Sequence, residues 1–87
     1  MEGRRLILND GTTIENGDAG KADGSLWLYF SGYTMQEVAD IFFDADKTSK
    51  IVYQFGDMNA EYDDYTNCVS INIDADGNNS VCMKKGV

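Results

Sequence analysis

The chain has 87 residues, a formal net charge of −8 and no histidine. This length suits one domain, whose core is too small to enclose a deep active site. The lack of histidine removes the usual acid–base group at neutral pH and the commonest nitrogen ligand for metals. The negative charge argues against direct binding of nucleic acid, because phosphates repel it. We therefore expect a single domain over residues 1–87, with no catalytic residue, cofactor or metal.

The start of the chain lacks the charged region and apolar region of a secretory signal, and no apolar run approaches the ~20 residues that a membrane helix needs. The two cysteines, Cys68 and Cys82, are expected to be free thiols, which suits a reducing compartment. We therefore expect a soluble cytoplasmic protein that does not contact a membrane.

A hairpin is predicted at the beginning of the chain. Residues 4–8 and 12–15 have strand-forming side chains, and Asn9-Asp10-Gly11 between them is a strong turn signal. Whether Leu6 or Ile7 pairs with Ile14 depends on the length of the turn, which the sequence leaves open.

The longest apolar run, residues 25–31, predicts a central strand with both faces covered. Alternation places Trp27 and Tyr29 on the face opposite Leu28. Residues 16–24, just before it, carry three glycines and no large side chain, which predicts a loop or a weak edge strand.

A helix is predicted from Thr34 to about Asp44. Thr34 and Glu37 have the spacing of a capping box, and apolar residues then recur at helical spacing. The apolar stripe consists of Met35, Val38, Ile41 and Phe42.

The second half of the chain predicts three more strands, over residues 50–55, 68–73 and 78–83, with a polar, acidic loop over residues 57–67. Asp74-Ala75-Asp76-Gly77 predicts a hairpin with a three-residue loop. That register sets Ile71 opposite Val81, Val69 opposite Met83 and Cys82 opposite Ser70. It also puts Cys68 on the same outer face as Cys82, as a diagonal neighbour ~7–8 Å away, too far for a disulfide.

The resulting order, β-β-β-α-β-β-β, predicts an α+β fold: a largely antiparallel sheet of about five to six strands with one helix packed on one face. Trp27 and Tyr29 would point to the face without a helix.

Residues 41–48, Ile-Phe-Phe-Asp-Ala-Asp-Lys-Thr, resemble the nucleophile motif of haloacid dehalogenase-like phosphatases. The resemblance implies a small hydrolase in which Asp44 attacks phosphorus and Asp46 is the acid. In that family the apolar run is a parallel strand of a much larger domain, whereas here it continues a capped helix, and Lys47 replaces the usual Gly. We therefore expect a helix end and an acidic turn.

The runs Asp44-Ala45-Asp46 and Asp74-Ala75-Asp76-Gly77 are similar to the calcium loop of EF-hands. Neither has the Gly and the Glu that the loop needs at its sixth and twelfth positions. Hence a hairpin turn is expected for the second run, without a bound metal.

The candidate binding surface is acidic and carries tyrosines. From Asp57 to Met83 the chain has no Lys or Arg, so this stretch produces a negative field. Tyrosine is enriched in interfaces, and carboxylates steer toward a basic partner; the alternative is a solvated loop that maintains solubility. The candidate partner-binding residues are Trp27, Tyr29, Asp57, Glu61, Tyr62, Asp63, Asp64, Tyr65, Asp74 and Asp76.

Carboxylates displayed along an edge imitate DNA, which carries one charge per ~1.7 Å of duplex. In size, acidity and lack of a catalytic motif, the whole chain resembles the small anti-CRISPR and other anti-defence proteins of phages and prophages. The resemblance implies an inhibitor of an RNA-guided nuclease or another basic, nucleic-acid-binding enzyme in the host cytoplasm, and it assigns no residue. We therefore expect a non-enzymatic acidic binding protein, whose binding weakens when Asp63 and Asp64 are reversed in charge.

The alternative function is a small structural or assembly protein of a phage head or tail. Identical copies would then cover the apolar outer strand face. The sequence leaves open whether the protein is a monomer or a homodimer.

Overall fold

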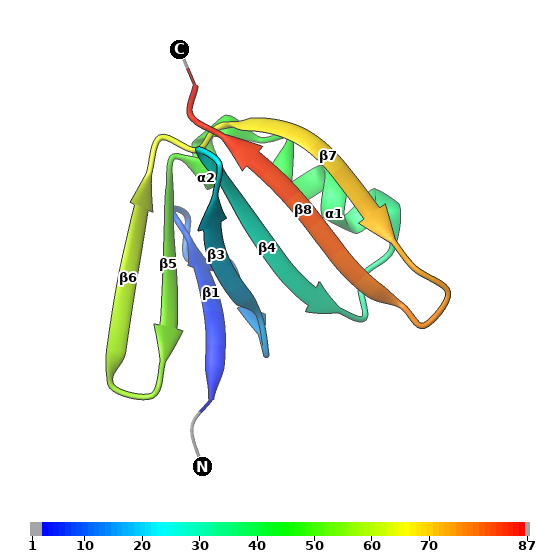
Figure 1. Cartoon of the computed structure of the whole chain (residues 1–87), viewed down its shortest axis with the longest axis horizontal. Helices are drawn as coiled ribbons and strands as arrows, with labels where there is room; N and C mark the ends of the chain where they lie inside the picture. Colours follow the sequence, from blue (N-terminus) through cyan, green and yellow to red (C-terminus); the bar gives the residue numbers. More distant parts are fainter. Residues whose placement is uncertain (1–2, 87) are drawn as a thin grey trace.

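The computed structural model describes residues 3–86. The fold is α+β, as predicted, but two antiparallel four-stranded sheets replace the single sheet that was expected. The first sheet has the strand order β2-β1-β5-β6 and the second the order β3-β4-β8-β7 (Figure 1). The elements are β1 (Arg4–Leu8), β2 (Thr13–Glu15), β3 (Asp18–Ala22), β4 (Ser25–Ser31), α1 (Met35–Phe42), α2 (Ala45–Thr48), β5 (Lys50–Phe55), β6 (Met58–Asp63), β7 (Asn67–Ile73) and β8 (Asn78–Lys84).

β1 and β2 form the predicted hairpin. Leu6 lies opposite Ile14, which resolves the register that the sequence left open. Gly11 has a φ of +92°, and its N–H donates to the carbonyl of Leu8 at 2.9 Å. This is the geometry of a three-residue loop that ends on a left-handed glycine.

The predicted central strand, β4, lies between β3 and β8. Its Leu28 is buried in the core, whereas Tyr29 points to the opposite face and is exposed. β3 is an edge strand that pairs with β4 along its whole length. Asp23 and Gly24, which connect β3 to β4, both have positive φ, as a tight type I′ turn requires.

The capping box of α1 is confirmed. The amide of Glu37 donates to Thr34 Oγ1 at 3.2 Å, and the amide of Thr34 donates to Glu37 Oε1 at 2.8 Å. Of the predicted apolar stripe, Val38 and Phe42 are buried, but Met35 is 49% exposed. Met35 lies in the first turn of α1 and extends beyond the core.

α1 ends at Phe42, with Phe43 as its C-cap, shortly before the predicted end near Asp44. Asp44 adopts an extended backbone and caps the short helix α2, its carboxylate accepting a hydrogen bond from the amide of Asp46 at 3.0 Å. A local bond from an aspartate to the backbone competes with continued helix, which explains the break.

The polar segment 57–67, predicted to be a loop, contains strand β6. Phe55 pairs with Met58 across a two-residue turn, in which Gly56 has a φ of +60°. Tyr62 packs against the core, and Glu61 on the other face of β6 is exposed.

The β7–β8 hairpin has the predicted three-residue loop, with Gly77 at a φ of +85°. Ile71 lies opposite Val81, as predicted, but a β-bulge between Cys68 and Ser70 then shifts the register. Val69 is therefore exposed, and the prediction that it faces the core opposite Met83 is wrong.

The same bulge separates the two cysteines. Cys68 takes the place opposite Met83 and packs against the core, whereas Cys82 lies beside Trp27 on the outer face. The prediction that both share the outer face is wrong. Both thiols are free, and burial raises the pKa of the Cys68 thiol.

Both sheets and α1 contribute to one core. Phe30 of β4 stacks on Phe42 of α1, with ring centroids 5.7 Å apart. Figure 1 shows α1 behind β7 and β8, on the inner face of the second sheet, while no described element lies over the outer face, from which Trp27 and Tyr29 project. None of the helices in residues 3–86 is long and apolar enough to cross a membrane.

Candidate binding surfaces

The predicted partner-binding residues do not lie on one surface. Asp57 lies in the β5–β6 turn, whereas Asp63 lies at the other end of β6. Asp74 and Asp76 lie in the β7–β8 turn, at another corner of the molecule (Figure 1). Tyr65 is 4% exposed and belongs to the core. The carboxylates therefore do not follow a single edge.

Lysines border the carboxylates of β6. Lys50 Nζ lies 3.3 Å from Glu61 Oε1, and Lys50 is also the cross-strand partner of Asp63. Lys85 lies over the ring of Tyr65, with its Nζ 5.5 Å from the ring centroid. Positive charge therefore weakens the negative field at this end of β6.

Hydrogen bonds attach the segment just before α1 to the β7–β8 turn and the start of β8. The amide of Gly32 donates to the carbonyl of Gly77 at 3.3 Å. Asn79 Oδ1 accepts from the amide of Tyr33 at 3.3 Å, and Asn79 Nδ2 donates to the Tyr33 carbonyl at 3.0 Å. These bonds hold the start of α1 beside the β7–β8 turn.

α1 carries two exposed carboxylates, on Glu37 and Asp40. There is no Lys or Arg in residues 22–46 or 51–83, so no basic side chain comes from α1, β7 or the β7–β8 turn. We call the four carboxylates of this region the acidic end: Glu37, Asp40, Asp74 and Asp76. Glu37 and Asp40 were not among the predicted partner-binding residues, although the absence of Lys and Arg from residues 22–46 is a signal that could have found them.

The backbone of the β7–β8 turn holds the Asp74 carboxylate in place. Asp74 Oδ1 accepts from the amide of Asp76 at 2.9 Å and from that of Asn78 at 3.0 Å, while Oδ2 accepts from Asn78 Nδ2 at 3.2 Å. The hydrogen bond from the Asn78 amide is the main reason that the pKa of Asp74 is lowered. Asp74 thus stabilises the turn as an anion.

We expect the hydrogen bonds of Asp74 to make the free energy of unfolding depend on pH in the acid range. The pKa of Asp74 is lowered from its ordinary value of 3.8, so its contribution to the free energy of unfolding is complete above that pH and is lost as the pH falls through the lowered value. Asp74→Asn should lose this part of the pH dependence, as measured by urea denaturation at a series of pH values. Asp76→Asn removes the same charge without breaking the Asp74 bonds, and should keep it. Identical pH profiles for the two variants would contradict the assignment.

Trp27 and Tyr29 form a second, separate surface on the outer face of the second sheet. Their ring centroids lie 6.5 Å apart and their ring planes differ by 11°. Tyr29 is 48% exposed. The two rings therefore present similarly oriented apolar surfaces side by side.

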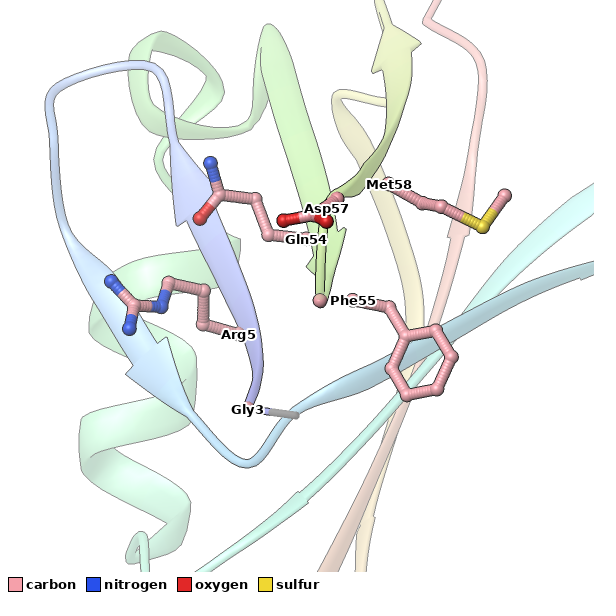
Figure 2. A pocket seen from close by; sticks show the side chains of 7 residues that line it. Gly3, Arg5, Gln54, Phe55, Asp57 and Met58 are labelled. Atoms are coloured by element: carbon pink, nitrogen blue, oxygen red, sulfur yellow. The ribbon is translucent and has the colours of Figure 1, made fainter. Parts of the chain in front are cut away.

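A pocket of about 700 Å³ lies at the β5–β6 turn. Figure 2 shows the residues that line it. Arg5 and Gln54 extend to one side of the strands, and Phe55 and Met58 to the other. The side chains do not converge on one point, so this pocket lacks the convergent polar groups of a ligand site.

Asp44 and Asp46 do not have the setting that a phosphatase nucleophile motif would need, because they belong to the cap and first turn of α2 rather than to the end of a parallel strand. Within residues 3–86, no three His, Cys, Asp or Glu side chains are grouped as a metal site would require. Comparison with protein-family models, with curated proteins and with solved structures gave no match.

Proposed function

We propose that this protein is a non-enzymatic acidic binding protein that engages a basic protein through its acidic end. The observation that carries the proposal is the attachment of α1 to the β7–β8 turn through Tyr33 and Asn79. It attaches α1, with its carboxylates, to the turn that carries Asp74 and Asp76, and neither element contains Lys or Arg. Such a concentration of one charge steers a basic surface into contact and orients it. Met35, exposed in the first turn of α1, adds adaptable apolar contact.

The proposed partner is a nucleic-acid-binding enzyme, with an RNA-guided nuclease as the first candidate, and the proposed role is inhibition. Such enzymes bind nucleic acid through Lys and Arg side chains that neutralise phosphates. The acidic end offers carboxylates to those same side chains. The small size, the acidity and the lack of a catalytic motif, which resemble those of phage anti-defence proteins, support this role, and the proposed place of the encounter is the cytoplasm of a bacterial host.

A displacement assay tests the proposal. A labelled nucleic acid is bound to each of a panel of RNA-guided nucleases and other basic nucleic-acid enzymes, and this protein is then added. We expect stoichiometric displacement from at least one enzyme, with an apparent affinity that falls as salt rises. No displacement from any enzyme of the panel, or displacement that is indifferent to salt, would contradict the proposal.

A second function, self-assembly as a phage head or tail accessory protein, is favoured by a different observation. Met58 is 71% exposed and lies beside its exposed cross-strand partner Phe55, on the edge strand β6. An open edge with apolar side chains can pair with another copy. Light scattering at micromolar concentration separates the two functions, because a stable ring or dimer supports assembly and a monomer supports the inhibitor.

A further inference from the structure

The outer face of the second sheet has no net negative charge, although the protein has a net charge of −8. Lys84, two residues after Cys82 on β8, lies on this face at the end away from Tyr29. Asp18 on β3 is a carboxylate at this face, and Arg4 offsets its charge, with Arg4 Nη1 3.1 Å from Asp18 Oδ2. A face of this kind complements an uncharged ligand rather than a basic protein. The uncharged side chains that the register places on it are Trp27, Tyr29, Ser70, Asn72, Ser80 and Cys82.

One side of Trp27 is open. Its cross-strand partner on β3 is Gly20, and no atom lies within 4 Å of the point where a Cβ of Gly20 would be. Its partner on the other side, Cys82, is buried although no described element covers this face. The side of Trp27 toward β3 therefore faces no neighbouring side chain at the position of Gly20.

A depression of about 340 Å³ adjoins Tyr29. The Arg4–Asp18 pair, Asn78 and Ser80 also line it. The guanidinium group donates hydrogen bonds, the carboxylate accepts them, and the amide and hydroxyl groups do both. Polar groups with both capacities therefore lie around one aromatic ring, which is the composition of a site for a small polar ligand.

A sugar ring matches this combination. Its C–H face is apolar and stacks on an aromatic ring, while its rim of hydroxyl groups both donates and accepts hydrogen bonds. A nucleobase would stack equally well, but the phosphates of its strand would be repelled by a protein of this charge.

We propose that the outer face of the second sheet binds a neutral glycan, with one hexose unit stacked on Tyr29 and held by the side chains of the depression. The ring of Trp27, 6.5 Å from that of Tyr29, receives the next unit of the chain. This site is separate from the acidic end, so a negative result for glycan binding would not contradict the proposed function.

Saturation-transfer NMR on the full chain tests the site. The probes are four neutral tetrasaccharides, made of β-1,4-linked glucose, α-1,4-linked glucose, β-1,3-linked glucose and β-1,4-linked mannose. We expect transfer to the C–H protons of at least one of them. Tyr29→Ala should weaken binding of that sugar by about tenfold or more, whereas Tyr29→Phe, which keeps the ring, should retain it.

Phe43→Ala is the matched control, because Phe43 is a 65% exposed aromatic residue that follows α1 and lies outside the depression. This variant should bind the sugar as the unchanged protein does. The proposal is overturned if none of the four sugars shows transfer, if Tyr29→Ala binds with unchanged affinity, or if oligothymidylate binds in preference to every sugar.

Discussion

Truncation of Leu28 to alanine should lower the free energy of unfolding by about 2–5 kcal/mol. Leu28 is fully buried at the centre of β4, between its cross-strand partners Ala19 and Val81. Its truncation removes apolar burial and leaves a cavity in the core to which both sheets and α1 contribute. Because a domain has only about 5–15 kcal/mol of stability in total, this loss is a large fraction of it.

Urea denaturation followed by circular dichroism measures this effect. Val69→Ala is the control, since Val69 is an exposed aliphatic residue in the same sheet. We expect it to change the free energy of unfolding by no more than about 0.5 kcal/mol. Equal losses of unfolding free energy in the two variants would contradict the burial of Leu28 in the core.

The second large effect is expected from Asn79→Ala. Asn79 is buried, and its side chain bonds both the N–H and the C=O of Tyr33. The substitution leaves these backbone groups without those partners, which should cost about 1–3 kcal/mol. It should also loosen the start of α1 from the β7–β8 turn and weaken binding of the basic partner.

Hydrogen exchange separates this local effect from a general loss of stability. In Asn79→Ala the amides of α1 should lose more protection than those of β1 and β5 in the other sheet. Asn72→Ala removes an exposed asparagine of the same sheet. It should leave the protection of the amides unchanged both in α1 and in β1 and β5. A uniform loss of protection in Asn79→Ala would show that the residue supports the fold as a whole rather than the attachment of α1.

The features that were predicted correctly are those with local causes. The capping box at Thr34 and the turns that end on Gly11 and Gly77 depend on a few neighbouring residues, and the structure confirms them. Strand β6 also had a local signal, because Gly56-Asp57 is a hairpin turn and the residues from Met58 to Asp63 alternate between apolar and polar. The acidic composition of that segment obscured the alternation.

Other features have no local signal. β3 is made of Asp, Ala, Gly and Lys, which have low strand propensity, and it is a strand because β4 offers it backbone partners. The bulge near Val69 moves an aliphatic side chain outward against the alternation. The acidic end depends on a contact between Tyr33 and Asn79, which are 46 residues apart, so the sequence showed the charges but not their proximity.

The most direct test of the account compares two charge-matched variants, Asp40→Lys/Asp76→Lys and Glu61→Lys/Asp63→Lys, in the displacement assay. Replacing one carboxylate by Lys raises the net charge by two, so each double substitution changes it from −8 to −4. The first pair leaves the capping box and the Asp74 bonds intact, and the second alters carboxylates that already face Lys50.

We expect the first variant to lose about tenfold or more in affinity for the basic enzyme, and the second to lose clearly less. Equal losses would mean that total charge, rather than the acidic end, governs binding, and this result would contradict the account.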